Sequence, residues 1–410
     1  MASSLQLSKR MHFSLLSFLL SNTNANYNRT FSTVIPSPVI PLFNCRRRKK
    51  LRRKLSSPRV KPIATCTPRP FPALDALVHR DSLFRFISRT RCFLSRQPHH
   101  LLSLPAAGKL HRELGFSRGR KPSRFASRHP LLLRIIHHPP PYGPLHLSFT
   151  PLMESLLSEE QSVFNSTATQ RITAVRKLLM ISSRHRIPLA KLHHCRHVLG
   201  LPYDFRDRVH NYPDFFRVTV DPDGRHVLEL VDWDPALAIS SLERDFIENE
   251  HRVCRTFKFS IPHVKALGLD DDDERKMTSL TTLPLISPYT DGSDLKPWTV
   301  EAEKYRVGVV HEFLSLTVEK RAYIHHIVEF KEELGLTRHT YDMLLKQPRA
   351  FYLAGTEMNW AVFLRDAYTE DGALLEKDPL VLFEEKLRRY ALMKEGEEEV
   401  VGNDARADTG

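Results

Sequence analysis

The strongest constraint on the fold is a spacing motif that recurs three times along the chain. A leucine is followed 21 residues later by a glycine, and another leucine directly precedes that glycine. A proline comes 13 or 15 residues after each glycine, and a cluster of apolar residues follows the proline. The positions are Leu94, Gly115 and Pro130, then Leu179, Gly200 and Pro213, then Leu314, Gly335 and Pro348. Such a repeat predicts one structural unit used three times, at about residues 93–150, 178–240 and 313–368.

The third copy indicates what a unit contains. Apolar residues recur at helical spacing over residues 320–334, and Gly335 suits the left-handed backbone position that ends a helix. Thr337 is the candidate cap of a second helix, over residues 337–347. Two apolar runs then predict paired strands, at residues 351–353 and 361–364.

The other two copies predict β-hairpins at the same place. In the second copy, residues 215–220 and 227–231 are rich in β-branched and aromatic residues, and the turn sequence Asp-Pro-Asp-Gly lies between them. In the first copy, residues 131–136 and 145–149 flank a proline-rich loop. Each copy thus contains a helix, a turn, a second helix and a hairpin, which is the plan of a winged helix-turn-helix module.

We therefore predict a mainly α protein with short β-hairpins, built from repeated helix-turn-helix-plus-hairpin units that are winged-helix-like. Some modules with this plan bind nucleic acid and others bind proteins, so the plan alone favours nucleic acid only slightly. The charge distribution points further in that direction. Residues 75–218 carry a net charge of +14, whereas residues 219–410 carry −14. This asymmetry indicates a polyanion-binding half joined to an acidic half.

Residues 1–70 are predicted to be an organelle transit peptide and a basic linker. They contain no acidic residue, and their start is rich in Ser, Thr and Asn with scattered Lys and Arg, which is typical of transit peptides. The apolar run 11–20 is much shorter than the roughly 20 residues of a bilayer span, so no membrane association is expected. The sequence Arg29-Thr30-Phe31-Ser32 resembles a mitochondrial processing site. We therefore predict import into the mitochondrion, with the chloroplast as the alternative.

Two more segments are predicted to lie outside the folded part of the chain. The basic run 45–55 could bind nucleic acid, but prolines follow it directly and block regular structure. It is better interpreted as part of the leader or linker. The acidic tail, residues 394–410, is expected to be disordered. The folded domain is then predicted over residues 71–393.

Four segments carry a resemblance to a known family. They are LGLPYDFRDRVHNYPDFFRV (199–218), LELVDWDPALA (228–238), SPYTDGSDLKPWTVEAEKYRVGVVHEFLSL (287–316) and KEELGLTRHTYDMLLKQPRAFYLAG (331–355). They resemble the plant organelle RNA recognition (PORR) domain family, whose founding name is WHAT'S THIS FACTOR. The resemblance extends over the folded domain and is looser near its start. Family members usually have the pattern [RK]-F-P-x-x-F there, whereas this chain has RHPLLLRI at 128–135, without the phenylalanine.

The resemblance implies a function but no contact residues. It implies RNA binding in mitochondria or chloroplasts and support of group II intron splicing, without known catalytic chemistry. Two alternatives of other classes stay open: a protein scaffold in an organelle ribonucleoprotein, and a DNA-binding nucleoid protein. The implied partners are single-stranded or intron RNA, with other organelle splicing factors as further partners.

The sequence offers little support for an enzyme or a metal site. No phosphate-binding glycine loop or nucleophile-elbow motif occurs, and the five cysteines contain no CxxC pair. His193 and His197 have a spacing that can hold a metal on a helix, but no third ligand is evident and Lys191 and Arg196 disfavour a cation. Asp234 is better interpreted as the cap of a helix beginning after it than as a catalytic acid. We predict no catalytic residue, no metal and no cofactor.

The basic residues of the first two copies are the candidate RNA contacts. A guanidinium group binds phosphate through two N–H groups and stacks on bases, and an aromatic ring such as that of Tyr203 can stack on a base. We expect the arginines to hold the RNA backbone rather than to read its sequence. The candidates are Arg118, Arg120, Lys121, Arg124, Arg128, Arg184, Arg186, Lys191, Arg196, Tyr203, Arg206, Arg208 and Arg217. The third copy lacks this excess of arginine and is expected to pack on a partner or on the other copies.

Overall fold

A computed structural model of the chain describes its residues in five stretches, 71–248, 286–296, 299–347, 350–355 and 359–393. The predicted leader and linker, the acidic tail and Pro348 lie outside these stretches.

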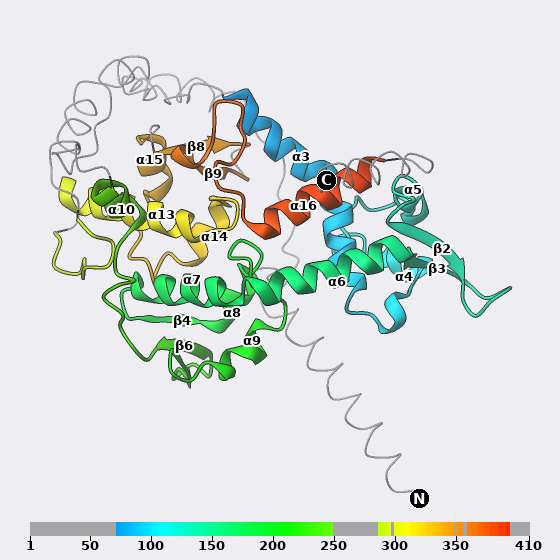
Figure 1. Cartoon of the computed structure of the whole chain (residues 1–410), viewed down its shortest axis with the longest axis horizontal. Coiled ribbons are helices and arrows are strands. Elements are labelled where there is room, and N and C mark those ends of the chain that lie inside the picture. The colour runs from blue at the N-terminus through cyan, green and yellow to red at the C-terminus, as the bar shows by residue number, and fades with distance from the viewer. Residues whose placement is uncertain (1–70, 249–285, 297–298, 348–349, 356–358, 394–410) are drawn as a thin grey trace, which may run out of the picture. The chain divides into compact units, whose positions relative to one another are not determined.

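The same order of elements occurs three times within the described residues (Figure 1). Each set has a helix, a short strand, two short helices and two further strands. Unit one contains α3 (Pro72–Leu94), β1 (Leu102–Ser103), α4 (Leu104–Lys109), α5 (Pro122–Ala126), β2 (Leu133–His137) and β3 (Leu145–Phe149). Unit two contains α7 (Ala168–Met180), β4 (Arg186–Pro188), α8 (Leu189–His194), α9 (Phe205–Arg208), β5 (Phe216–Val220) and β6 (His226–Leu230). Unit three contains α13 (Val300–Leu316), β7 (Arg321–Tyr323), α14 (Ile324–Glu329), α15 (Thr340–Leu345), β8 (Phe351–Ala354) and β9 (Ala361–Leu364).

Within the described stretches, three further helices lie outside this repeated order. Helix α6 (Pro151–Ser166) connects units one and two, α10 (Ser241–Glu248) follows unit two, and α16 (Pro379–Leu392) follows unit three. Single 3₁₀ turns occur at Pro98–His100, Val209–Asn211 and Arg365–Ala367. Across the described stretches, none of the helices combines the length and the apolar character needed to cross a bilayer.

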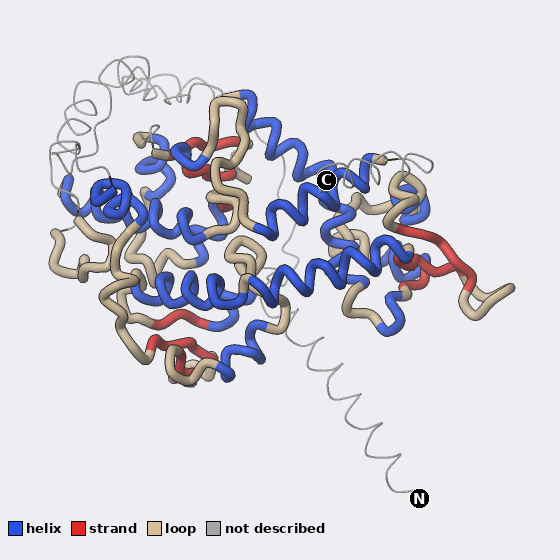
Figure 2. The backbone as a smooth tube through the Cα atoms, viewed as in Figure 1, coloured by secondary structure: helices blue, strands red, loops and turns tan. Residues whose placement is uncertain are grey.

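Each unit forms a small antiparallel sheet whose last strand lies in the centre. The orders are β1-β3-β2, β4-β6-β5 and β7-β9-β8, and Figure 2 shows the short strands in separate groups among the helices. The predicted hairpins are confirmed. In unit two, Phe216 pairs with Leu230 and Val220 with His226, on either side of the Asp-Pro-Asp-Gly turn.

The outer short strands differ from the prediction. A single helix was expected over residues 320–334, but residues 321–323 form β7 and pair with β9, and α14 begins only at Ile324. The reason is a left-handed backbone at Lys320, with φ of 50°, which interrupts the helical path before β7. His185 has φ of 51° at the matching place before β4, so this bend is a feature of the repeated fold.

Two predicted helix caps are also wrong, although the predicted glycine is right. Gly335 has φ of +59°, as its place after a helical segment requires. Helix α15, however, begins at Thr340 rather than after Thr337, whose carbonyl accepts a hydrogen bond from the Thr340 hydroxyl at 2.6 Å. Asp234 caps a turn and not a helix: its carboxylate accepts from the Ala236 N–H at 3.0 Å, and the next helix begins at Ser241.

Units two and three share one hydrophobic core. Val175 and Leu178 from α7 belong to the same buried cluster as Val307, Val310 and Phe313 from α13. Helix α13 is buried along most of its length, because α7, α10, α15 and the unit-three sheet all pack against it. Its buried residues are mostly apolar, but Lys304, His311 and Glu312 are buried with them and need polar partners inside the protein.

Unit one has a core of its own, which α16 completes. Phe383 and Leu387 of α16 belong to the same buried cluster as Phe86 and Leu94 of α3, and α16 also packs against α6. The guanidinium of Arg91, also on α3, lies 2.6 Å from Glu384 and 3.4 Å from Glu160. The start of α3 belongs to a third cluster, in which Leu74 packs with Tyr352 and Phe363 of the unit-three sheet. Helix α3 therefore ties unit one to unit three.

A buried carboxylate joins the segments around α13. Glu312 lies 2.9 Å from the ammonium of Lys177, accepts from the hydroxyl of Tyr289 at 2.6 Å and accepts from the Ser241 N–H at 2.7 Å. Burial acts to raise the pKa of the Glu312 carboxyl. The charge of Lys177 and the hydrogen bonds from Tyr289 and Ser241 outweigh that effect and hold the pKa below its ordinary value.

Replacing Glu312 by Gln should lower the free energy of unfolding by about 3 kcal/mol, because the substitution leaves the buried ammonium of Lys177 without a counter-charge. Chemical denaturation monitored by circular dichroism measures this loss. The control is Glu385→Gln, which removes a solvent-accessible pair with Lys377 and should cost about 1 kcal/mol or less. Equal losses in the two variants would contradict the structural role of Glu312.

The effect of Glu312 should also depend on pH. Its pKa in the folded protein is depressed, so its stabilisation is fully present above the pKa of the unfolded chain, roughly 4.3, and is lost as the pH falls through the folded value. The stability difference between the wild type and Glu312→Gln should therefore narrow on acidification. A difference that stays constant from neutral to strongly acid pH would argue against this linkage.

Candidate nucleic-acid interface

The structure gathers three arginines and a histidine near one tyrosine. We call them the Tyr203 cluster: Arg96, His193, Arg196, Tyr203 and Arg206. Tyr203 lies in the connection between α8 and α9. Gly200, with φ of +66°, reverses the chain just before it and returns the connection to the side of α8. Arg96 follows α3 of unit one, so the cluster spans two units.

Two guanidinium groups lie against the Tyr203 ring. The Cζ atom of Arg96 is 4.4 Å from the ring centre, and that of Arg196 is 4.9 Å from it. The imidazole of His193 meets the same ring at 5.2 Å, nearly edge-on. Each guanidinium is tethered by one bond, from Arg96 to the carbonyl of Cys92 at 2.5 Å and from Arg196 to that of His193 at 2.7 Å. Both keep further N–H groups that can bind a ligand.

The cluster concentrates positive charge without a carboxylate to balance it. Of the ion pairs formed among the described residues, none includes Arg96, Arg196 or Arg206. Partial burial lowers the pKa of His193, and the charges of the three arginines lower it further. Partial burial likewise lowers the pKa of Arg196, with a contribution from Arg96. A bound anion would relieve this mutual repulsion.

Tyr203 acts on the arginines directly. Its side chain is 49% exposed, and its cation–π contacts hold the guanidinium groups of Arg96 and Arg196 beside it. Stacking of Tyr203 on a base stays a prediction. The two guanidinium groups already lie against the ring, and a base would have to stack beside them. Arg96 was absent from the predicted set. No local pattern distinguishes it from the other basic residues, since its contact with Tyr203 crosses between two units.

Other predicted residues of unit two have acidic partners. Lys191 lies 2.7 Å from Glu333 of unit three, and Arg208 lies 2.6 Å from Asp204 one helical turn away. These pairs neutralise part of the charge that the sequence suggested for RNA.

Two more predicted arginines lie beside acidic residues on the sheet of unit two. Arg186 lies 3.3 Å from Asp221 and 4.0 Å from Glu229. Arg217 is the cross-strand partner of Glu229 on the other side. Arg184, by contrast, is exposed, and none of the ion pairs among the described residues includes it.

The predicted residues of unit one surround α5 and are all exposed. Arg118 and Arg120 precede the helix, Lys121 is its N-cap residue, Arg124 lies within it and Arg128 follows it. Helix α5 packs beside β2, and the β2–β3 hairpin projects from the rest of unit one (Figure 1). Near the hairpin tip, Tyr142 is 94% exposed. A tyrosine in a proline-rich loop between two strands is a signal that sequence reasoning could have used.

His193 and His197 do not share a helix as predicted, because α8 ends at His194 and His197 lies in the turn that follows. No group of three or more His, Cys, Asp and Glu side chains in the described stretches has an arrangement that could hold a metal ion. The ring of His197 instead lies 4.8 Å from that of His326 of unit three. Burial and neighbouring positive or imidazole groups lower the pKa of both, to about 4 for His197 and about 3 for His326. Both imidazoles are therefore neutral at pH 7.

Comparison with known proteins identifies the family. The model of the plant organelle RNA recognition domain matches residues 71–398. The chain belongs to this family. No solved structure matches the chain.

Named relatives are plant proteins. Over 326 residues the chain is 36% identical to Protein WHAT'S THIS FACTOR 1, chloroplastic, of Zea mays, covering 77% of this chain and 64% of that protein. It is 28% identical to Protein ROOT PRIMORDIUM DEFECTIVE 1 of Arabidopsis thaliana, over 78% of this chain and 81% of that protein. It is 25% identical to Protein WHAT'S THIS FACTOR 9, mitochondrial, of Arabidopsis thaliana, over 80% of this chain and 84% of that protein. The chain spans a little less than two thirds of the chloroplastic relatives that it matches.

An anion bound at the Tyr203 cluster should raise the pKa of His193, because it offsets the arginine charges that now lower that pKa. Titration of the imidazole by NMR, with and without a saturating nucleoside monophosphate, measures the change. The rise should vanish in an Arg196→Ala, Arg206→Ala double variant. An unchanged His193 titration in the wild type would show that the cluster does not hold the phosphate.

Proposed function

We propose that the chain binds single-stranded RNA in a plant organelle and supports the splicing of group II introns without catalysing it. The observation that carries this proposal is the Tyr203 cluster in a member of an RNA recognition family. Its three arginines have no carboxylate partner within the described residues, yet an aromatic ring holds two of them in place. Such a group is suited to phosphate, which a guanidinium binds through two parallel N–H bonds.

The predicted basic residues then divide into two roles. Arg96, Arg196 and Arg206 would bind the RNA backbone. Lys191 and Arg208 hold the surface in shape, because each already has a carboxylate at 2.7 Å or less. Arg186 and Arg217 flank Glu229 on the sheet of unit two and belong to the same supporting group.

The exposed residues around α5 would provide a second backbone contact in unit one. Winged-helix modules commonly grip nucleic acid with their last helix and with the hairpin that follows it. The order of elements in each unit and the central place of its last strand support a winged-helix-like interpretation. In that interpretation α5 and α9 take the gripping position, and each carries a net charge of +1, from Arg124 in α5 and from two arginines against Asp207 in α9. Helix α15 of unit three carries Asp342 there instead, which favours a packing role for unit three.

In this mechanism the protein holds the intron in a reactive shape and the RNA supplies the chemistry. That task requires no cofactor. It requires positively charged side chains at positions that match successive phosphates. Each phosphate contact releases condensed counterions, so affinity should fall steeply with salt.

Replacing Arg196 and Arg206 by Ala together should weaken the binding of related and unrelated single strands alike. The slope of log affinity against log salt should flatten by about one unit per lost phosphate contact. The matched control is Arg186→Ala with Arg208→Ala, which removes the same charge from the same unit but from residues that have acidic partners. Filter binding across a salt series, with thermal melting in parallel, measures both. Equal effects in the two double variants would mean that only net charge matters.

The same assay shows which kind of nucleic acid the protein prefers. Single-stranded RNA, duplex RNA and duplex DNA are compared at matched salt. We expect single-stranded RNA to bind most tightly, because an irregular cluster around one tyrosine suits a flexible strand better than a duplex groove. Preference for duplex DNA would favour the nucleoid alternative, and absence of binding to all three would favour the scaffold.

The location of the protein is also part of the proposal. The relatives at 35–36% identity carry the word chloroplastic in their names, and the relative at 25% identity carries the word mitochondrial. A fusion of residues 1–75 to a fluorescent protein should enter an organelle in plant cells, since this segment is free of acid until Asp75. Co-imaging with plastid and mitochondrial markers identifies the compartment. Fluorescence confined to the cytosol would contradict organelle import.

A further inference from the structure

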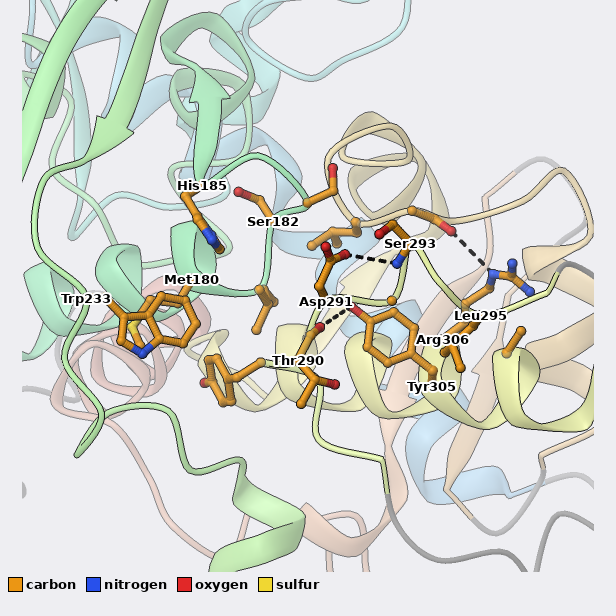
Figure 3. Close-up of a pocket in the computed structure, with 17 residues that line it drawn as sticks. Met180, Ser182, His185, Trp233, Thr290, Asp291, Ser293, Leu295, Tyr305 and Arg306 are labelled. Atoms are coloured by element: carbon orange, nitrogen blue, oxygen red, sulfur yellow. Dashed lines mark hydrogen bonds between the residues drawn. The ribbon is translucent and has the colours of Figure 1, made fainter.

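A cavity of about 590 Å³ lies where units two and three meet (Figure 3). Its walls come from the end of α7 and the turn that follows, from Trp233 after β6, from residues 289–295, and from one face of α13. Gly335, after α14, completes the lining. The volume lies within the range of small-ligand sites, roughly 300–1,000 Å³. The RNA-binding proposal above assigns no role to this space.

Flat rings form much of the wall. The ring of Trp233 lies 5.2 Å from that of His185, and the Trp233 side chain is 38% exposed. Figure 3 shows Trp233, His185 and Tyr305 around the same space. The Nδ1 atom of His185 lies 3.4 Å from the carbonyl oxygen of Leu179, which favours a proton on Nδ1 and leaves Nε2 as an acceptor.

The wall opposite Trp233 is held in place. The hydroxyl of Tyr305 donates to the carbonyl of Thr290 at 3.1 Å (Figure 3). Gly292 lies close against one side of the same ring, since a Cβ atom there would come within 2.3 Å of it. Tyr289, which also lines the cavity, is fixed through its hydrogen bond to the buried Glu312. A cavity with fixed walls loses little conformational entropy when a ligand enters.

Two charged groups of opposite sign lie at the cavity. Asp291 is exposed, and the Ser293 N–H, which donates to its carboxylate at 2.9 Å, lowers its pKa and keeps it ionised. Arg306 donates through Nε to the carbonyl of Gly335 at 3.3 Å (Figure 3), and none of the ion pairs among the described residues includes it. Its terminal N–H groups can therefore bind a further anion.

We propose that this cavity receives one unpaired base of the bound RNA. The flat faces of Trp233 and Tyr305 stack on the base, and Arg306 binds an adjoining phosphate. Asp291 accepts hydrogen bonds from the base, which selects guanine because only guanine presents two adjacent N–H donors to one carboxylate. An apolar peptide side chain would use the rings but neither charge, whereas a nucleotide uses all three features. This inference rests on the proposed function and adds a base-selective site to a backbone-binding surface.

The first test titrates nucleoside monophosphates into the full-length protein, as the wild type and with Arg196→Ala plus Arg206→Ala, by isothermal titration or saturation-transfer NMR. The double variant removes binding at the Tyr203 cluster, so its remaining binding reports on the cavity, and each cavity variant is made in both backgrounds. GMP should bind more tightly than AMP, CMP or UMP. Trp233→Ala should weaken all four, and Trp233→Phe should restore binding, since Phe retains a stacking face. Asp291→Asn should abolish the preference for GMP. Equal binding of the four nucleotides by the wild type overturns the role of Asp291, and unchanged binding by Trp233→Ala overturns the site.

The second test separates this site from the backbone contacts. A single-stranded RNA that binds the protein is made abasic at each position in turn. One abasic position should weaken binding roughly tenfold to a hundredfold, the range expected for one base–aromatic stack. In Trp233→Ala that position should have no further effect, while the salt dependence stays as in the wild type. The control is Val231→Ala, at an exposed residue two positions earlier that does not line the cavity.

Failure of the cavity proposal can be distinguished from failure of the proposed function. If Arg196→Ala with Arg206→Ala leaves the salt slope unchanged, the backbone proposal fails whatever the abasic scan shows. If the salt slope responds but no abasic position is coupled to Trp233, the protein binds RNA without using this cavity, and the inference is overturned. Melting temperatures of all variants are compared, so that loss of binding through unfolding is recognised.

Discussion

The buried carboxylate of Glu312 is the interaction on which the arrangement of units two and three depends. An ionised carboxylate inside a protein is tolerated only when its partners are in place, and here they come from three other segments: α7, the start of α10 and residues 286–296. The apolar contacts between α7 and α13 are not directional, so they define the relative position of the two helices less sharply than hydrogen bonds do. The bonds to Lys177, Ser241 and Tyr289 are satisfied in one arrangement. The hydrophobic core therefore supplies most of the stability, and this polar group selects the register.

A feature could be predicted from the sequence when the residues that determine it are close together along the chain. The hairpins were predictable because a turn such as Asp221 to Gly224 has local chemistry that fixes the register of the strands on either side. The left-handed glycines were predictable for the same reason. The short strands β4 and β7 were missed, because each has only three residues and its partner lies some 40 residues further along the chain. The apolar residues of β7 therefore resembled the beginning of a helix.

The candidate site shows the same division. The pair between Arg208 and Asp204 could be expected from a spacing of four residues on a helix. The pair between Lys191 and Glu333 could not, since 142 residues separate its members. The same holds for Arg96, which reaches Tyr203 from another unit. The sequence alone identifies the basic residues. The packing of the units determines which of them pair with a carboxylate and which stay available to bind a ligand.

This selection also changes the meaning of the charge asymmetry. Many acids of the second half of the chain do not form an acidic surface, because they are bonded to basic residues of the first half: Glu312 to Lys177, Glu333 to Lys191, Asp378 to Arg171 and Glu384 to Arg91. Each such pair is neutral at pH 7 and binds the two halves together. These Lys and Arg side chains are therefore not available to bind a polyanion. Within the part of the chain that the structure describes, the arginines of the Tyr203 cluster form no ion pair, so the charge open to an anion is concentrated at fewer positions than the net charge suggests. Under the proposed function, such a chain would bind RNA at defined places while its paired charges stabilise the fold.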